Sequence, residues 1–434
     1  MVFLVIITQV IGCLIGTAML KNKIQCIALI LFNVAFYLYS CFGITTYNLD
    51  PQFYYCFIKC VLTLDVFFIA GDKLCCLIAK ETTIGGNTYG CKSDYIIQTK
   101  TQYLKWITII YFVARIAWLF YPEFNLKYAF QAPNFLYRNS LEAANLSVSN
   151  PLGKIFSTLT TITLPFSMIY IRKSGNKKHL MYFFIFDTYV QYLMGRASIG
   201  RLSIIKNILV VCLVLYITEE NKKKKRKYIT ISAISVVLSI IIYLVMENWR
   251  NGVSISFFDV SIGESIKHFV DSELFYPSHY NLANSLHGRN VYPASIFWIW
   301  LLTLPIPKTI FNLSMVDSYS SIIYRVYTYY YWGGHWGNER GYAGMLLSVM
   351  GDGILVYGTD YAFIIVIPFA LFIGFFLRFL LKIRNCEIMY CTALFYFFVS
   401  FRPGVQYALQ YINTFVGMII IILMFKILKP KENN

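Results

Sequence analysis

Long apolar runs separated by short basic segments dominate the chain. Several of these runs approach the roughly 20 residues that a helix needs to cross a bilayer. Inside hydrocarbon every backbone N–H and C=O must be paired within its own segment, so runs of this length must be helical. The pattern predicts an all-α, polytopic integral membrane protein with about 11 spans. The predicted spans are 1–20, 24–43, 53–79, 104–121, 152–171, 180–195, 202–219, 228–246, 361–382, 386–401 and 408–427.

Basic residues occur in alternate connections, the longest group being the unbroken run from Lys222 to Lys227. Cytoplasmic loops of membrane proteins carry the excess of Lys and Arg. One alternation fits every loop, with the N-terminus outside and the C-terminus inside. Met1–Leu20 lacks a basic start and a small-residue cleavage site, so we interpret it as the first span. The whole chain, 1–434, is expected to form a single membrane domain.

Two long external loops are predicted, at about 122–151 and 247–360, and loops of such length are usually functional. Aromatic and amide residues in the first loop fit interfacial helices or a surface that stacks on sugars. In the second loop the apolar segment Ile296–Leu304 is followed by Pro305 and Pro307. This segment suits a re-entrant or interfacial helix better than a span. Tyr342–Gly358 has the same ambiguity, and if both segments crossed the membrane there would be about 13 spans.

Composition agrees with this class, because 58% of the residues are hydrophobic and 14% are charged. The net charge of +17 is explained by cytoplasmic loops that face an anionic leaflet, so it requires no nucleic-acid partner. Most of the 11 cysteines lie in or beside the first three spans, without the paired spacing of a zinc site. The sequence has no dinucleotide fingerprint and no P-loop. We expect no cofactor and no metal.

Ionisable residues on the external side are the candidate functional groups, since charges at membrane depth are expensive. Arginine offers a fixed fork of donors that matches phosphate oxygens. Several converging arginines would form a pocket for a lipid-linked pyrophosphate. At the outer ends of spans, Arg196, Arg250 and Arg402 have the alternative of reaching lipid headgroups. His279 and His287 are expected to be ordinary surface or core residues.

The densest group of polar residues lies between Trp332 and Gly358. His335, Glu339 and Arg340 fall within six residues among glycines, a pattern that suits catalysis as well as structure. Asp352 is flanked by Gly351 and Gly353, and a helix cap explains it as well as a catalytic role does.

Ser348–Gly358 resembles a segment of the bacterial oligosaccharide repeat-unit polymerases, the O-antigen or capsule polymerases of the Wzy type. That family often carries Ser-x-x-Gly-Glu and a later Gly before a span. Ser348, Gly351 and Gly358 match, while Asp352 stands in place of Glu. Further similarities are the spacing from Arg340 to Gly351, the proline turn Leu304–Lys308 and the Gly-Arg-Ala-Ser-Ile-Gly-Arg turn between two middle spans. The resemblance covers about Leu180 to the C-terminus.

The resemblance implies a glycosyltransferase on the outer face of the bacterial inner membrane. Its donor would be a glycan on undecaprenyl pyrophosphate, its acceptor a single lipid-linked repeat unit, with a chain-length regulator as an optional partner. Cations would stabilise the leaving pyrophosphate and a general base would activate the acceptor hydroxyl. The expected pyrophosphate-binding residues are Arg201, Arg289, Arg340, Arg196 and Arg325. The expected bases are His335, Glu339 and Asp352, and the expected sugar-binding residues are Tyr331, Trp332 and Trp336. The outside has no Asp-x-Asp pair, so the reaction is predicted to be metal-independent.

Three alternatives remain at this point. An O-antigen ligase shares the architecture but passes the glycan to the lipid A core. A flippase or another transporter usually shows repeated halves and short loops, which this sequence lacks. An acyltransferase would need a histidine in a buried or cytoplasmic-side setting.

Overall fold

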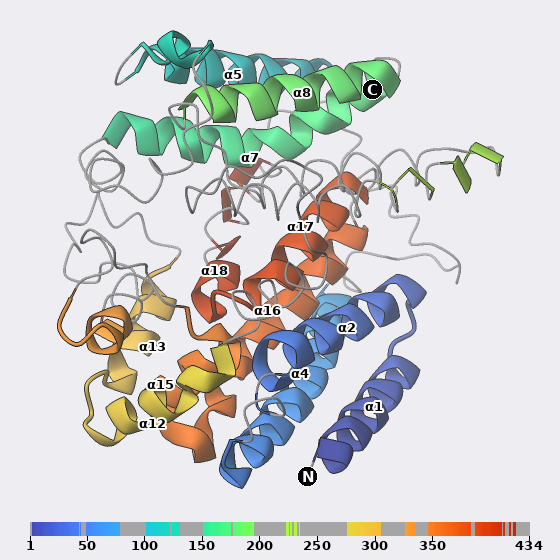
Figure 1. Ribbon diagram of the computed structural model, residues 1–434. Helices are drawn as coiled ribbons and strands as arrows, with labels where there is room; N and C mark the ends of the chain where they lie inside the picture. The colour runs from blue at the N-terminus through green and yellow to red at the C-terminus, as the bar shows by residue number, and fades with distance from the viewer. Residues whose placement is uncertain are drawn as a thin grey trace. The chain divides into compact units, whose positions relative to one another are not determined.

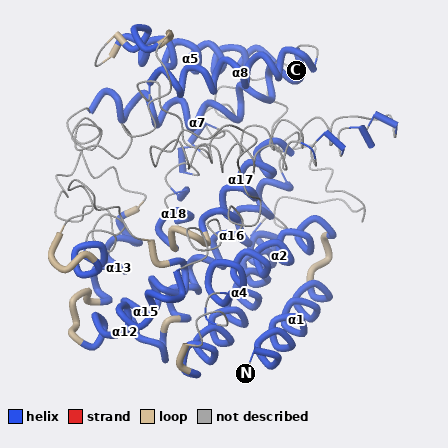
Figure 2. Tube along the Cα trace, in the orientation of Figure 1, coloured by secondary structure: helices blue, strands red, loops and turns tan. Residues whose placement is uncertain are grey.

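The structure is a computed structural model. It describes residues 2–42, 44, 49–78, 101–121, 124–130, 151–174, 177–194, 276–304, 326–335, 346–382 and 387–409, and scattered residues within 223–234 and 411–421. Within these ranges the regular structure is entirely helical, which confirms the all-α prediction for this part of the chain (Figure 2). The predicted spans 202–219 and 228–246 lie outside the described residues apart from isolated positions, and most of 408–427 does too.

The chain forms two compact units. The first contains Met1–Ser93, Ile266–Lys382 and Ala393–Val416, and the second contains Asp94–Ser265, Ile383–Thr392 and Gly417–Asn434. We describe each unit by itself. The sequence-based expectation of one membrane domain stays a prediction.

The first unit is built on α4 (Pro51–Ile78) and α16 (Phe363–Lys382), which lie side by side (Figure 1). α1 (Val2–Met19) packs on α4, and α2 (Lys23–Phe36) continues through a π-helix, η1 (Tyr37–Cys41). In the described residues four helices are long and apolar enough to cross a membrane: Val2–Met19, Lys23–Cys41, Gln102–Phe120 and Phe363–Lys382. Apolar side chains such as Phe3, Leu14 and Val66 are exposed, as lipid-facing positions are.

α4 and α16 approach each other closely at two glycines. A Cβ on Gly71 would lie 2.3 Å from the carbonyl oxygen of Leu371, and a Cβ on Gly374 would lie 2.1 Å from that of Phe68. Small residues at a membrane helix interface allow backbones to pack closely. On the C-terminal side of this crossing, Arg378 forms an ion pair with Asp72, with 3.6 Å between Nε and Oδ1.

The relative directions of the packed helices agree with the alternation predicted from charge. Gly374 packs on Phe68 and Lys382 donates to the carbonyl oxygen of Cys75, so α4 and α16 run parallel, as predicted for the third and ninth spans. Phe32 contacts Phe68 and Phe36 stacks on Phe57, so α2 runs antiparallel to α4. Which end faces the cytoplasm stays a prediction from charge.

The late part of the first unit consists of short helices. They are η5 (Tyr276–His279), α12 (Tyr280–Gly288), α13 (Ala294–Thr303), α15 (Ser348–Tyr361) and α18 (Val405–Leu409). α17 (Glu387–Ser400) leads into α18 through a turn. The 10-residue apolar α13 is too short to span a bilayer, in line with the re-entrant or interfacial interpretation of Ile296–Leu304.

The second unit packs α5 (Thr101–Phe120), α7 (Pro151–Ser174) and α8 (Lys177–Met194) against one another (Figure 1). Its apolar clusters include Tyr111, Met168 and Phe183, and, at the other end, Leu119 with Val190. Of the first external loop, the structure describes one short 3-10 helix, η3 (Asn125–Tyr128). The two apolar clusters make α5 parallel to α8, and the contact of Tyr121 with Phe156 makes α7 antiparallel to α5, as the predicted alternation requires.

Candidate functional site

The start of α15 is hydrogen-bonded to the turn between α17 and α18. The N–H of Ser348 donates to the carbonyl oxygen of Arg402 at 3.1 Å, and that of Val349 donates to Phe401 at 3.2 Å. The first N–H groups of a helix have no partner within the helix, so these bonds satisfy them. Ser348 has a φ of 66°, a left-handed conformation that is uncommon outside glycine. Ser348–Gly358 is therefore held against the turn that contains Arg402.

A buried hydroxyl cluster joins this segment to two other helices. Tyr280 at the start of α12 donates its proton to the carbonyl oxygen of Ser40 at 3.2 Å. Its oxygen lies 2.9 Å from Ser348 Oγ, so Ser348 is the donor in that contact. All three residues are completely buried. This cluster brings α12, α15 and the π-helix η1 to one point, and π-helical turns are often found at functional sites.

Asp352 lies inside α15 and does not cap that helix, but it accepts a hydrogen bond from the first N–H of α18. Its side chain is 1% exposed, and Oδ2 accepts a hydrogen bond from the N–H of Val405 at 3.0 Å. Burial raises the pKa of Asp352 well above its usual range. A carboxyl group in this place cannot touch a substrate without movement, but it fixes the turn that carries Arg402. Its geometry is that of a positioning residue.

Glycine is required opposite this carboxyl group. Gly404 has a φ of 103°, and a Cβ there would lie 2.0 Å from Asp352 Oδ2. The turn can pass the carboxyl group only because position 404 has no side chain. Sequence reasoning had no signal for this pair, because the two residues are 52 positions apart and neither stands in a motif that names the other.

Gly358, the last of the three glycines in Ser348–Gly358, interrupts α15 with φ 71° and ψ 177°. A Cβ there would lie 2.8 Å from Cδ2 of His287, so the His287 ring packs directly on this backbone. His287 is half-buried, in accord with the expectation of an ordinary residue, and Arg289 follows α12 as its exposed C-cap. Arg289 is the one arginine of the expected pyrophosphate-binding set within the described residues.

Aromatic residues pack beside α12. Helix 326–331 carries Tyr327, which is buried, and Tyr331, which is half-buried together with Trp332. The ring of His279 meets that of Tyr331 at 4.8 Å between centroids, and Tyr331 meets Trp332 at 4.9 Å. The partly exposed rings of Tyr331 and Trp332 offer the apolar faces that sugars stack on. His335 follows and is exposed.

His279 gives this region a pH-dependent stability. Burial lowers the pKa of His279 to about 4, below its usual value of about 6.5. Between these values the unfolded chain binds more protons than the folded one, so the free energy of unfolding falls as pH is lowered. At about pH 5 the free energy of unfolding is expected to be about 2 kcal/mol lower than at neutral pH because of this residue.

Thermal unfolding of the purified protein and its His279→Phe variant, measured across this range, checks that value. The phenylalanine ring keeps the packing and does not titrate, so the variant should lose less stability on acidification than the wild type. Equal acid sensitivity of both proteins would show that His279 is not the group responsible.

The other expected site residues, Arg196, Arg201, Arg325, Trp336, Glu339 and Arg340, lie outside the described residues. Within the described part, the structure brings together Asp352 and the Arg402 turn through direct hydrogen bonds. Sequence reasoning missed Tyr280 and Ser40, which are ordinary in composition and belong to the site only through long-range contacts.

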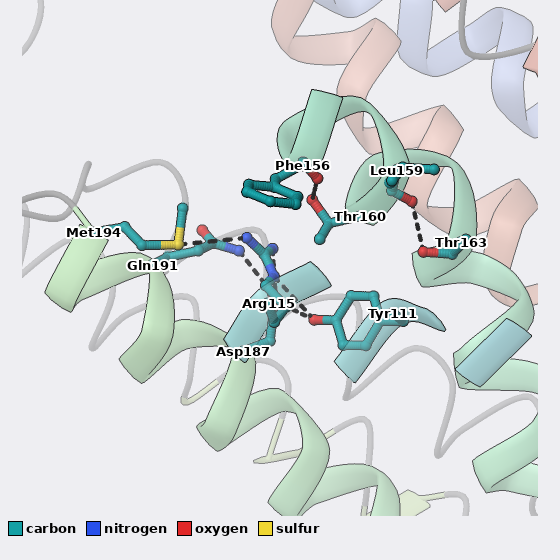
Figure 3. A network of polar contacts seen from close by, with 9 residues as sticks. All are labelled: Tyr111, Arg115, Phe156, Leu159, Thr160, Thr163, Asp187, Gln191 and Met194. Atoms are coloured by element: carbon teal, nitrogen blue, oxygen red, sulfur yellow. Dashed lines mark hydrogen bonds and ion pairs between the residues drawn. The ribbon is translucent and has the colours of Figure 1, made fainter. Parts of the chain in front are cut away.

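The second unit contains a separate polar network, which joins α5 to α8 (Figure 3). Arg115 Nη2 lies 2.7 Å from Asp187 Oδ1, and Tyr111 donates to the same oxygen. Gln191 donates to Asp187 Oδ2 at 2.7 Å, and Arg115 also approaches the sulfur of Met194. Both carboxylate oxygens are occupied. Because breaking a buried ion pair strongly destabilises a protein, we interpret this network as the clamp between α5 and α8.

No protein-family model matches the chain, and the comparisons with curated proteins and with solved structures also found no match.

Proposed function

We propose that this chain is a surface-polysaccharide polymerase, of the type that builds O-antigen or capsule, in the inner membrane of a bacterium. In this proposal about 11 spans place the site on the outer face. There it joins oligosaccharide repeat units carried on undecaprenyl pyrophosphate. The observation that carries the proposal is the hydrogen-bonded union of the Ser348–Gly358 segment with the Arg402 turn.

These hydrogen bonds support a lipid-pyrophosphate donor because they hold the turn that contains the cationic residue Arg402 beside a preorganised backbone. Cations held in place stabilise the charge that develops on a leaving group, without reorganisation during the reaction. Half-buried Arg402 and exposed Arg289 are the described arginines of this region. Arg196, Arg201, Arg325 and Arg340 are the further candidates from the sequence.

The reaction would displace the pyrophosphate from the donor sugar. The acceptor hydroxyl oxygen bonds to the anomeric carbon, and the bond from that carbon to the pyrophosphate oxygen breaks. The electron pair leaves with undecaprenyl pyrophosphate, and the hydroxyl proton passes to a base. His335 and Glu339 are the candidate bases, because the burial of Asp352 gives it the positioning role instead. Tyr331 and Trp332, with Trp336, would stack on the sugar rings.

Arg340→Ala is expected to leave the protein in the membrane while the surface glycan stops at a single repeat, because the leaving group loses a stabilising cation. Electrophoresis of the surface glycan, with immunoblotting of the membrane fraction, measures both. Lys59→Ala serves as the control, since Lys59 makes an exposed ion pair with Asp360 and a hydrogen bond to its carbonyl oxygen, and exposed pairs contribute little.

The same gel separates the rival functions. A flippase defect would leave no repeat on the surface, and a ligase defect would leave long chains on the undecaprenyl carrier. Normal chain lengths in the variant would remove Arg340 from the site.

A further inference from the structure

Three polar side chains meet at the middle of three helices in the first unit. They are Gln9 on α1, Asn33 on α2 and Asp65 on α4, with exposed fractions of 8%, 4% and 3%. Each lies near the midpoint of its helix, and Val2–Met19 and Lys23–Cys41 are long and apolar enough to cross a membrane. If these helices span the bilayer, the cluster lies near its centre, where an ionisable group is a functional candidate by default.

The hydrogen bonds of the cluster satisfy only one side of the carboxyl group. Gln9 Nε2 donates to the carbonyl oxygen of Asn33 at 2.7 Å. Asn33 Nδ2 donates to Asp65 Oδ1 at 2.7 Å. Asp65 Oδ2 is buried and has no hydrogen-bond partner within the described residues. It faces α1 at Gly12, where a Cβ would lie 2.9 Å from it.

Within the part of the chain that the structure describes, no cation balances this carboxyl group. Among the described residues no Lys, Arg or His nitrogen lies within 4.0 Å of Asp65. The titratable group that faces it from α1 is the thiol of Cys13, with Cys26 of α2 beyond. Asp72, two turns further along α4, is paired with Arg378 of α16. Asp187 in the second unit shows the opposite arrangement, because Arg115 and Gln191 occupy both of its oxygens.

We propose that Asp65 is a proton-binding site in the middle of the α1–α2–α4 group, with the proton held on Oδ2. A lone carboxylate in an apolar setting is very costly, and a group in that position neutralises instead. The step is simple: an aqueous proton bonds to a carboxylate oxygen, and the negative charge disappears. A metal cation fits the site poorly, since it needs several oxygen ligands and meets here an amide donor and a glycine backbone.

The proton site shares a helix with the candidate functional site. Asn33 lies on α2, and two turns later the π-helix η1 brings Ser40 to Tyr280. Gain or loss of the proton therefore changes the contacts of a helix whose far end packs on Ser348.

Infrared spectroscopy of the full chain in lipid vesicles tests the proposal without any assay of activity. The wild type is expected to show a protonated-carboxyl C=O band at neutral pH of which one component is lost in Asp65→Asn. Asp360→Asn, the control, should lose carboxylate bands instead, because Asp360 is exposed and ion-paired with Lys59. A loss of carboxylate bands in Asp65→Asn would show that Asp65 is ionised and would overturn the proposal.

If Asp65→Asn does not fold, the wild type itself provides the test. Dicyclohexylcarbodiimide, which dissolves in lipid, reacts with protonated carboxyl groups in apolar surroundings. Mass spectrometry should find the adduct on the peptide that contains Asp65, in a yield that falls as pH rises and is unchanged by sodium ions. Protection by sodium ions would indicate a cation site, and an unmodified Asp65 would indicate an ionised one, and either result contradicts proton binding.

Discussion

Gly374→Ala is expected to destabilise the folded protein by about 1–3 kcal/mol or more, because it forces a methyl group into a closely packed helix crossing. The added Cβ would lie 2.1 Å from the carbonyl oxygen of Phe68, which is backbone and cannot rotate away. α4 and α16 would have to separate along the centre of the first unit. Thermal unfolding of the detergent-solubilised protein, followed by size-exclusion chromatography, measures the loss.

Gly288→Ala is the matched control, since a Cβ at the end of α12 meets nothing within 4 Å. The two variants make the same chemical change, and both replace a helical glycine. Equal stability of Gly374→Ala and the wild type would mean that α4 and α16 do not cross at this distance.

Asp352→Ala is expected to lower chain lengthening by about 10²-fold, whereas Asp352→Asn should stay close to the wild type. Alanine leaves the buried N–H of Val405 without an acceptor, at a cost of about 1–3 kcal/mol, and releases the turn that carries Arg402. Asparagine keeps an oxygen in the same place and has the shape of the neutral acid. Chain-length distributions from cells with matched amounts of each variant provide the measurement.

The asparagine variant separates positioning from catalysis. If Asp352 were the general base, chain lengthening would fall about 10²–10⁴-fold in both variants, because neither side chain can take the proton from the acceptor hydroxyl. Asp360→Asn is the control, since the side chain of Asp360 is 81% exposed and its partner is the exposed side chain of Lys59.

Hydrophobic pattern predicted the helices well, because span length and apolarity are local properties of the sequence. The predicted span 361–382 is found as Phe363–Lys382, which is long and apolar enough to cross a membrane, and segment 180–195 falls on the helix Lys177–Met194. Span 24–43 was predicted as one helix, but its last turn is π-helical. The π-turn carries Ser40, whose contact with Tyr280 is a tertiary effect with no counterpart in the pattern.

The sequence pattern singled out only one part of the candidate site, the segment Ser348–Gly358. Ser348, Gly351 and Gly358 drew attention to α15, and the positive φ at Ser348 and Gly358 shows that this segment has an unusual backbone. The role of Asp352 depended on Val405 and Gly404, which no periodicity or spacing connects to it. Asp65 was also missed, since one acidic residue in an apolar run does not alter the prediction of a span.

The most direct test of the proposed function is polymerisation by the purified protein. Undecaprenyl-pyrophosphate-linked repeat units, extracted from a strain that lacks the gene, would be incubated with the protein in lipid vesicles without nucleotides. We predict a ladder of lipid-linked products that grows by one repeat per step, with free undecaprenyl pyrophosphate released in equal amount. Repeat units that stay single, or that only cross the bilayer or move to the lipid A core, would contradict the account.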